Sequence, residues 1–182
     1  SDVYVASQAT ESIAGWAFDT ALTDLNNDPG MDAIELGTTF AERFHETGDK
    51  TLSVVDLAEL AELDPAINAF ADSLLAKTDP RSNILPLARD TQNFDGDPND
   101  KDFRDFLGRL IETANDDDIL DSADDLDLEL DEAIFANFTN GRQWRNATGL
   151  SIYIPTNGFD STYRDGRWNE FTKWGDVVEA VR

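Results

Sequence analysis

The chain has 182 residues, about the length of one domain, and its 38 acidic and 14 basic residues give it a formal net charge of -24. A surface this acidic repels phosphate backbones and anionic lipid headgroups, which argues against nucleic-acid and membrane-surface binding. With 11 Phe, 4 Trp and 3 Tyr, the chain can still fill a hydrophobic core. There is no Cys, so this chain holds no disulfide, thiolate metal site or cysteine nucleophile.

The acidic composition also predicts an environment. Of the acidic residues 27 are Asp, and Arg outnumbers Lys by 10 to 4. Self-repulsion should weaken the fold unless salt shortens the Debye length, which is about 10 Å at 0.1 M and about 3 Å at 1 M. We therefore expect a high-salt setting, with an ordinary acidic secreted domain as the alternative. The start at Ser1, without an initiator Met or a signal peptide, predicts a processed or trimmed product that further polypeptide precedes.

The first predicted elements are a strand and two helices. The apolar segment at residues 3–6 predicts a short strand, and a helix is predicted over about residues 15–26. From Asp32, apolar residues recur at helical spacing up to Gly48. We therefore predict a second helix with Asp32 as its N-cap and Gly48 as its stop.

The middle of the chain predicts a strand followed by helices. Residues 51–56 are β-branched and apolar, which is typical of a buried strand, and an amphipathic helix follows as far as Leu75. Pro65 either kinks this helix or starts a second segment. Three more helices are predicted at residues 84–94, 102–114 and 126–138.

The helices predicted at residues 102–114 and 126–138 fall in an acidic helical region at about residues 95–140. Between Asp95 and Glu132 there are 16 acids and 3 bases, a net charge of -13. Paired carboxylates can serve as catalytic acid and base, but in so acidic a chain any spacing arises by chance, so a solvated face is the better interpretation. A strand near residues 150–154 and a helix over residues 168–181 complete the chain.

These elements predict an α/β fold. Short strands near residues 3–6, 51–56 and 150–154 should form a partial, mostly parallel sheet flanked by amphipathic helices. The single histidine, His45, lies beside the apolar stripe of its helix and away from any glycine-flanked serine, so no Ser-His-Asp triad is indicated. We expect it to be solvated or to cap the C-terminus of that helix.

Other motifs are weak. Asp95, Asp97 and Asn99 match the start of a calcium-binding EF-hand loop, but Asp100 and Phe106 replace its glycine and glutamate. The EF-hand is therefore excluded, and an irregular calcium site at Asp95, Asp97 or the aspartates from Asp116 is left open.

Two further patterns involve Asn and Arg. Asn137 and Asn146 each begin a glycosylation acceptor triplet, which leaves modification open. Arg142 and Arg145 flank Trp144, and in a chain this acidic they predict ion-paired structure rather than a nucleic-acid site.

Five segments, taken in order, resemble the clostripain-like cysteine peptidases, a family with a caspase-like fold. They are residues 5–18 (VASQATESIAGWAF), 51–57 (TLSVVDL), 102–107 (DFRDFL), 148–155 (TGLSIYIP) and 168–171 (WNEF). In that family the catalytic histidine and cysteine lie N-terminal to the first of these segments. The resemblance therefore implies that residues 1–182 are either a single domain or the C-terminal part of a larger peptidase domain, without the catalytic dyad.

The resemblance also implies a function. The family performs acyl transfer with a thiolate and a histidine and prefers a basic residue before the scissile bond. Thr10 matches a position of the loop that lines the substrate pocket, and we add Glu11 on charge complementarity with a substrate Arg. The alternative for both residues is capping of the next helix. No catalytic residue, metal ligand or cofactor is assigned to this chain, apart from the calcium left open above.

The expected partners are an upstream peptidase half that carries the dyad and a peptide or protein substrate. Two other functions stay open: a catalytically inactive peptidase-like module that binds a protein, and an acidic calcium-binding domain. The family resemblance favours a secreted or cell-surface location.

Overall fold

A computed structural model describes residues 2–10, 15–46, 51–94 and 97–182. The strands are β1 (Val3–Ala6), β2 (Thr51–Asp56), β3 (Asp100–Asp102), β4 (Ile134–Thr139) and β5 (Ser151–Tyr153). The α-helices are α1 (Phe18–Asn27), α2 (Ala33–His45), α3 (Leu57–Leu75), α4 (Pro80–Asp90), α5 (Phe103–Thr113), α6 (Asp117–Ala133) and α7 (Trp174–Val181). Three 3-10 helices are η1 (Arg142–Trp144), η2 (Ser161–Asp165) and η3 (Arg167–Glu170).

The strands form two small antiparallel sheets, so the mixed α/β class is confirmed but the parallel pairing is wrong. One sheet has the order β1-β2-β4 and the other pairs β3 with β5. In the first sheet Tyr4 lies opposite Val55, and Val54 lies opposite Ala136. The alternation of strands and helices along the chain favours parallel pairing, but it does not fix strand order. The strand predicted near residues 150–154 therefore lies outside the sheet that holds β1 and β2.

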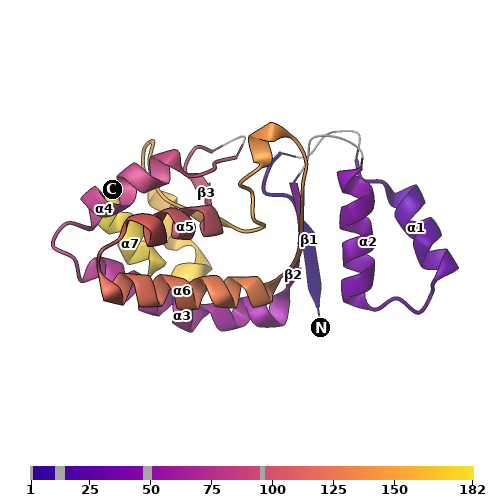
Figure 1. The fold of residues 1–182 in the computed structure, drawn as a ribbon, viewed down its shortest axis with the longest axis horizontal. Helices are drawn as coiled ribbons and strands as arrows, with labels where there is room; N and C mark the ends of the chain where they lie inside the picture. The colour runs from indigo at the N-terminus through magenta and orange to yellow at the C-terminus, as the bar shows by residue number, and fades with distance from the viewer. Residues whose placement is uncertain (1, 11–14, 47–50, 95–96) are drawn as a thin grey trace.

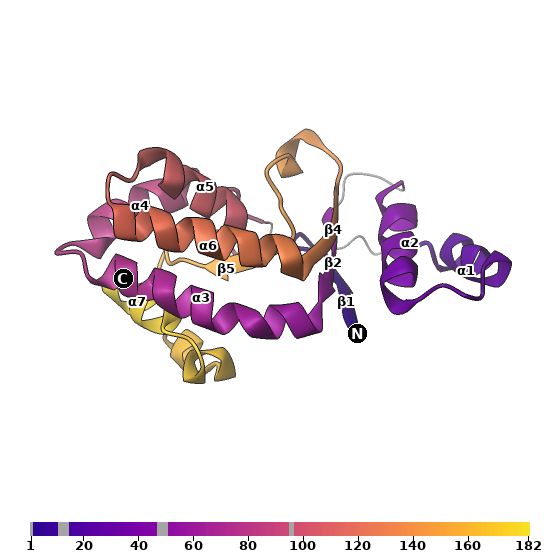
Figure 2. The ribbon, with the colours of Figure 1, turned by 60° about the horizontal axis from the view of Figure 1, so that its bottom comes forward.

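The first sheet lies between two groups of helices (Figure 1). On one side α1 and α2 cover it, and on the other α3 to α7 form a larger helical body, as the tilted view also shows (Figure 2). The core on the α2 side contains Phe44, Leu52 and Val54. The larger core contains Phe70, Phe106 and Trp174, all fully buried. The chain thus has a core on each side of the sheet, and burial of their large apolar side chains supplies much of its stability.

Several predicted helices are confirmed. α2 begins with the Asp32 cap, whose side chain accepts from the Ile34 and Glu35 amides, and the Glu35 side chain completes a capping box. α3 runs through Pro65 as one helix. α5 matches the helix predicted at residues 102–114.

Other helix boundaries were wrong. α4 begins at Pro80, not near residue 84, because Asp79 caps it and Pro80 occupies its first turn. The helix predicted at residues 126–138 starts earlier, at Asp117, and ends at Ala133. The following segment, Ile134–Thr139, forms β4, so the acidic region at about 95–140 is not helical throughout.

The C-terminal helix is shorter than predicted. Residues from Trp168 to Glu170 belong to η3, and α7 begins only at Trp174. No helix within the described parts of the chain is long and apolar enough to cross a membrane.

Candidate functional site

The loop that follows β1 is fixed to the first residue of β2. The buried hydroxyl of Thr51 accepts hydrogen bonds from the backbone amides of Gln8 and Ala9, both at 3.1 Å, and lies 2.8 Å from the Ser7 hydroxyl. These contacts hold residues 7–9 in one conformation. Thr10, the predicted substrate-binding residue, comes next and is exposed.

The side chain of Gln8 connects this loop to the second sheet. Its Nε2 donates to Asp102 Oδ2 at 3.0 Å, and its Oε1 accepts from the Gly149 amide at 3.0 Å. Both ends of the amide are therefore used, which fixes its orientation. We call Gln8, Asp102, Thr148 and Gly149 the Asp102 cluster.

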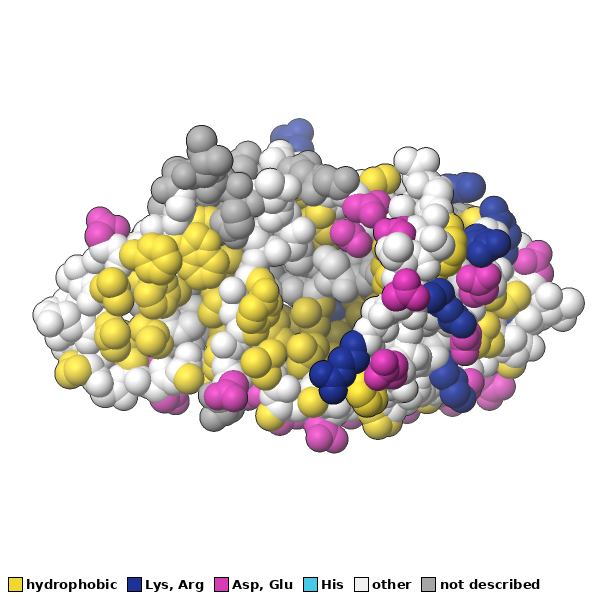
Figure 3. All heavy atoms as spheres, turned by 180° about the vertical axis from the view of Figure 1, so that it is seen from behind, with side chains coloured by type: hydrophobic (Ala, Val, Ile, Leu, Met, Phe, Trp, Pro, Cys, Tyr) yellow, Lys and Arg dark blue, Asp and Glu magenta, His cyan; other side chains and the backbone are white. Residues whose placement is uncertain are grey.

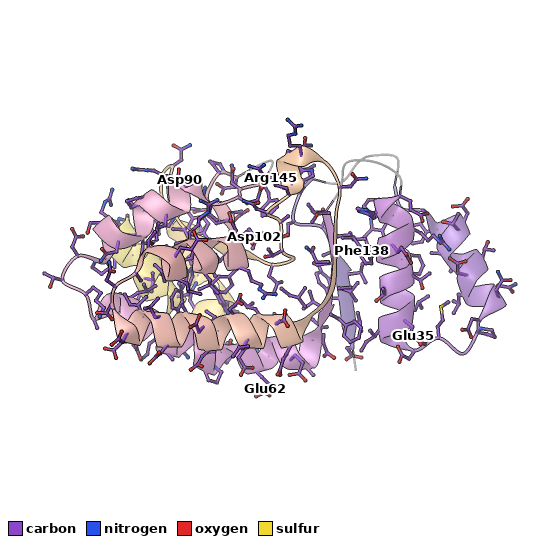
Figure 4. The ribbon with its side chains drawn as sticks, in the orientation of Figure 1. Glu35, Glu62, Asp90, Asp102, Phe138 and Arg145 are labelled. Atoms are coloured by element: carbon purple, nitrogen blue, oxygen red, sulfur yellow. The ribbon has the colours of Figure 1, made fainter. Side chains whose placement is uncertain are left out.

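Asp102 is the centre of this cluster and is fully buried. Its carboxylate caps α5 through the Asp105 amide at 2.9 Å and accepts from both the amide and the hydroxyl of Thr148. Burial raises the pKa of Asp102, and the hydrogen bonds from Thr148, Asp105 and Gln8 lower it, with burial the largest effect. Figure 4 shows Asp102 in the interior, close to the loop that carries Arg145.

Gly149 makes close packing at the cluster possible. It has φ +118°, and an added Cβ would lie 2.9 Å from Ile134 Cγ2. The Ser53 hydroxyl donates to the Gly149 carbonyl at 2.7 Å, which connects the loop to β2. Residues from four of the five segments that carry the family resemblance thus meet here: Gln8, Ser53, Asp102 and Gly149.

An apolar hollow of about 430 Å³ lies beside the cluster. Its lining includes Leu57, Phe103, Leu150 and Trp168, the last from the fifth resembling segment. Seen from behind, apolar side chains gather over α1 and α2 and around a hollow near the centre of the molecule (Figure 3).

The predicted functional residues are only partly described. Thr10 is exposed beside the anchored loop, whereas Glu11 lies outside the described residues. Sequence reasoning did not identify Gln8 or Asp102 as partners. A signal for Asp102 was present, because an Asp directly before an apolar helix is typical of an N-cap.

Of the two expectations for His45, solvation or capping of the helix C-terminus, the structure contradicts the first. His45 is the last residue of α2, and it is partly buried with its ring centre 5.9 Å from that of Phe138. Its Nδ1 is buried and has no hydrogen-bond partner among the described residues. His45 therefore packs against β4.

The aspartates considered for calcium have other contacts. Asp97 accepts from the Asn99 amide at 2.8 Å, and Asp116 caps α6 and pairs with Lys77 Nζ at 2.6 Å. The hydrogen bond from Lys77 lowers the pKa of Asp116. Among the described residues no group of three or more His, Cys, Asp or Glu side chains is arranged to hold a metal ion. Asp95 lies outside the described residues.

Three solved structures are similar to this fold. A secreted C11 cysteine protease from Bacteroides thetaiotaomicron, in complex with an irreversible peptide inhibitor, has a TM-score of 0.64 and 14% identity, covering 98% of this chain and 52% of that one. An inactive zymogen C11 protease from Parabacteroides distasonis has a TM-score of 0.62 and 19% identity, and the match covers 97% of this chain and 51% of that one. A clostripain from Bacteroides thetaiotaomicron, in complex with the peptide inhibitor BTN-VLTK-AOMK, has a TM-score of 0.59 and 16% identity. That match covers 97% of this chain and 76% of the clostripain chain.

The chain therefore has the caspase-like fold of the C11, or clostripain-like, cysteine proteases, and the family resemblance is confirmed at the level of the fold. It spans about half the length of the first two structures. No protein-family model and no curated protein matches the sequence.

Proposed function

We propose that this chain is the C-terminal part of a clostripain-like cysteine endopeptidase. The observation that carries the proposal is the fold match, which covers nearly all of this chain and about half of two C11 proteases. The chain contributes the sheet, its cores and one wall of the substrate pocket. The catalytic cysteine and histidine come from a partner segment, because the sequence contains no Cys.

The pocket wall in this proposal is formed by residues 7–10 together with Glu11, which follows them in the sequence. Its hydrogen bonds to Thr51 and, through Gln8, to Asp102 hold the backbone that leads to Thr10. A pre-ordered loop binds substrate with a smaller loss of conformational entropy. We propose that Thr10 and Glu11 bind the basic side chain before the scissile bond, with Glu11 as the charged partner of a substrate Arg.

The partner segment packs against the apolar hollow at Leu57, Phe103 and Trp168. Such a surface is costly to leave in water, and its burial would hold the two parts together. In the complete enzyme a thiolate attacks the peptide carbonyl, a histidine transfers the proton to the leaving amine, and backbone donors stabilise the oxyanion. The secreted C11 neighbour supports a secreted location.

The first experiment reads the coding sequence upstream of Ser1 and measures by intact mass which polypeptides copurify with this chain. We expect a histidine, then an acidic residue two positions before a cysteine, on a polypeptide that copurifies. The assembled particle should cleave a fluorogenic substrate with Arg before the scissile bond, and iodoacetamide should abolish cleavage. An upstream region without that cysteine overturns the proposal and leaves the protein-binding module.

A second experiment tests the pocket. In the assembled enzyme, Thr10→Val combined with Glu11→Gln should raise KM for the Arg substrate about tenfold and change kcat little, since a ground-state contact is lost. Thr78→Val combined with Glu62→Gln makes the same chemical changes at two exposed positions, on α3 and just after it, and as the matched control it should leave both constants unchanged. Unchanged kinetics in the double variant would remove Thr10 and Glu11 from the pocket.

A further inference from the structure

Five of the ten arginines gather around two adjoining hollows. The first, of about 420 Å³, has Arg104, Arg109 and Arg145 in its lining. The second, of about 410 Å³, has Arg89, Arg109, Arg142 and Arg145. Arg109, Arg145 and Asn146 line both, so the hollows form one continuous surface, which we call the arginine strip. The chain as a whole has a net charge of -24, so half of its arginines are concentrated on one part of an otherwise acidic surface.

Much of this positive charge is not neutralised. Arg104 pairs with Asp127 and Asp131, and Arg109 pairs with Asp105. Arg89, Arg142 and Arg145 form no ion pair with any carboxylate in the described residues. The prediction that Arg142 and Arg145 belong to ion-paired structure is therefore wrong for the part of the chain that the structure describes.

The acids on the strip do not cancel this charge. Asp90 and Glu112 line the hollows, one in each, together with Asp105, which is already paired with Arg109. The second hollow therefore has four arginines against one carboxylate, Asp90. Neutral side chains that can donate hydrogen bonds, such as Gln92 and Asn146, line the rest.

The scaffold under the strip is rigid. Trp144 lies between Arg142, the first residue of η1, and Arg145, which follows η1. It is buried and stacks on Phe94 with ring centres 5.8 Å apart. Its backbone accepts from the Ala147 amide at 2.9 Å and donates to the Gly141 carbonyl at 3.1 Å. Arg142 and Arg145 are thus exposed on a fixed turn, and binding a ligand costs little backbone ordering.

From this arrangement we infer that the arginine strip binds an extended acidic peptide segment through its Asp and Glu side chains. A guanidinium donates two parallel hydrogen bonds to a carboxylate, and the open, adjoining hollows suit several carboxylates along an extended chain. A peptide can carry its Asp and Glu residues only where it lies over the strip and have neutral residues elsewhere. A nucleic acid carries a phosphate at every nucleotide, which would extend over the surrounding acidic surface.

The strip lies next to the substrate-pocket loop, because Ala9 packs against the Phe94, Trp144 and Ala147 cluster. If the proposed function holds, the strip selects substrates that carry acidic residues a short distance from the basic residue at the scissile bond. This last step rests on the proposed function, whereas binding of the peptide does not.

The test is therefore a binding assay on the 182-residue chain alone. A fluorescein-labelled peptide of alternating Asp and Gly is titrated by anisotropy at about 0.1 M salt and again at about 1 M salt. We expect saturable binding that is lost at high salt, and no binding of the matched Asn-Gly peptide. A labelled single-stranded oligonucleotide that binds more tightly than the Asp peptide would overturn the assignment.

The decisive comparison uses two variants that lose the same charge. Arg142→Gln with Arg145→Gln should weaken peptide binding about tenfold, whereas Arg167→Gln with Arg182→Gln, away from the strip, should change it less than about twofold. Equal effects of the two variants, or no saturable binding to the unmodified chain, would overturn the inference. Failure of peptidase activity would leave this result untouched, so the two proposals fail separately.

Discussion

Gln8 and Asp102, 94 positions apart in the sequence, are joined by a hydrogen bond of 3.0 Å between Gln8 Nε2 and Asp102 Oδ2. This contact connects the loop after β1 to the N-terminus of α5. Because Asp102 is fully buried, the bond lies where water does not compete with it. The conformation of the predicted pocket loop therefore depends on a carboxylate in the interior of the molecule.

We expect Asp102→Ala to destabilise the fold strongly. The substitution leaves Gln8 Nε2, the Asp105 amide and both donors of Thr148 without their acceptor, at a cost of about 2–5 kcal/mol in the free energy of unfolding. Urea denaturation, monitored by tryptophan fluorescence, measures this loss in the free energy of unfolding. Asp79→Ala, which removes only an exposed helix cap, is the control and should cost about 1 kcal/mol. Equal losses would contradict the central role of Asp102.

The raised pKa of Asp102 predicts a pH dependence. A carboxyl whose pKa is higher in the folded than in the unfolded state stabilises the fold below its unfolded pKa, and this stability is lost as pH rises through the folded value. The ordinary pKa of an Asp side chain is 3.8. As the pH rises above that value, the free energy of unfolding of the unmodified chain should therefore fall relative to that of the Asp102→Asn variant. Urea titrations of both proteins from about pH 4 to about pH 7 measure the difference. If the free energy of unfolding of the unmodified chain instead rises with pH relative to that of the Asp102→Asn variant, folding lowers the pKa of Asp102 and the prediction is wrong.

Gly149 and Gly108 should respond oppositely to alanine. Gly149→Ala forces φ +118° on an L-residue and a contact of 2.9 Å with Ile134 Cγ2, so we expect a loss of about 2–4 kcal/mol. Gly108 lies within α5 with nothing within 4 Å of an added Cβ, so Gly108→Ala should gain about 0.5–1 kcal/mol. Thermal and urea unfolding of both variants give the comparison. A Gly149→Ala variant as stable as the unmodified chain would show that Ile134 can move.

The local features of this fold could be predicted from the sequence. β1, β2 and the capped helix α2 follow from short patterns: an apolar run, a β-branched run and an Asp before apolar residues at helical spacing. The helical spacing of Phe103, Phe106 and Leu107 predicts the helix at residues 102–114, and the structure has Asp102 as its N-cap. Such signals are contained within a single element.

The features that depend on distant residues could not be predicted. The apolar pattern that continues from α6 predicts a helix as far as Phe138, yet Ile134–Thr139 forms β4 because β2 offers unpaired backbone groups beside it. The contacts of Asp102 with Thr148 and Gln8 span 46 and 94 positions. No local pattern contains them, so the centre of the candidate site was missed.

Salt should stabilise this chain. With a net charge of -24, its acidic side chains repel one another. About 3 M KCl screens this repulsion far better than about 0.1 M KCl, so we expect the Tm at the higher concentration to be about 5 °C or more above the Tm at the lower one. Differential scanning calorimetry at the two concentrations gives the shift. The triple variant Asp121→Asn, Asp124→Asn and Asp125→Asn removes three exposed charges from α6 and should show a smaller rise. An identical Tm at both concentrations would remove the high-salt interpretation.

The position of β4 has a consequence for synthesis of the chain. β2 is the central strand of its sheet, and Val54 lies opposite Ala136, so the third strand leaves the ribosome only after α3 to α6 have been made. Until then the buried side chains of β2 lack one neighbouring strand, and pairing over such a sequence separation is slow. The nascent chain therefore passes through a period in which an apolar strand has an open edge, and chaperone binding during translation would protect it from aggregation.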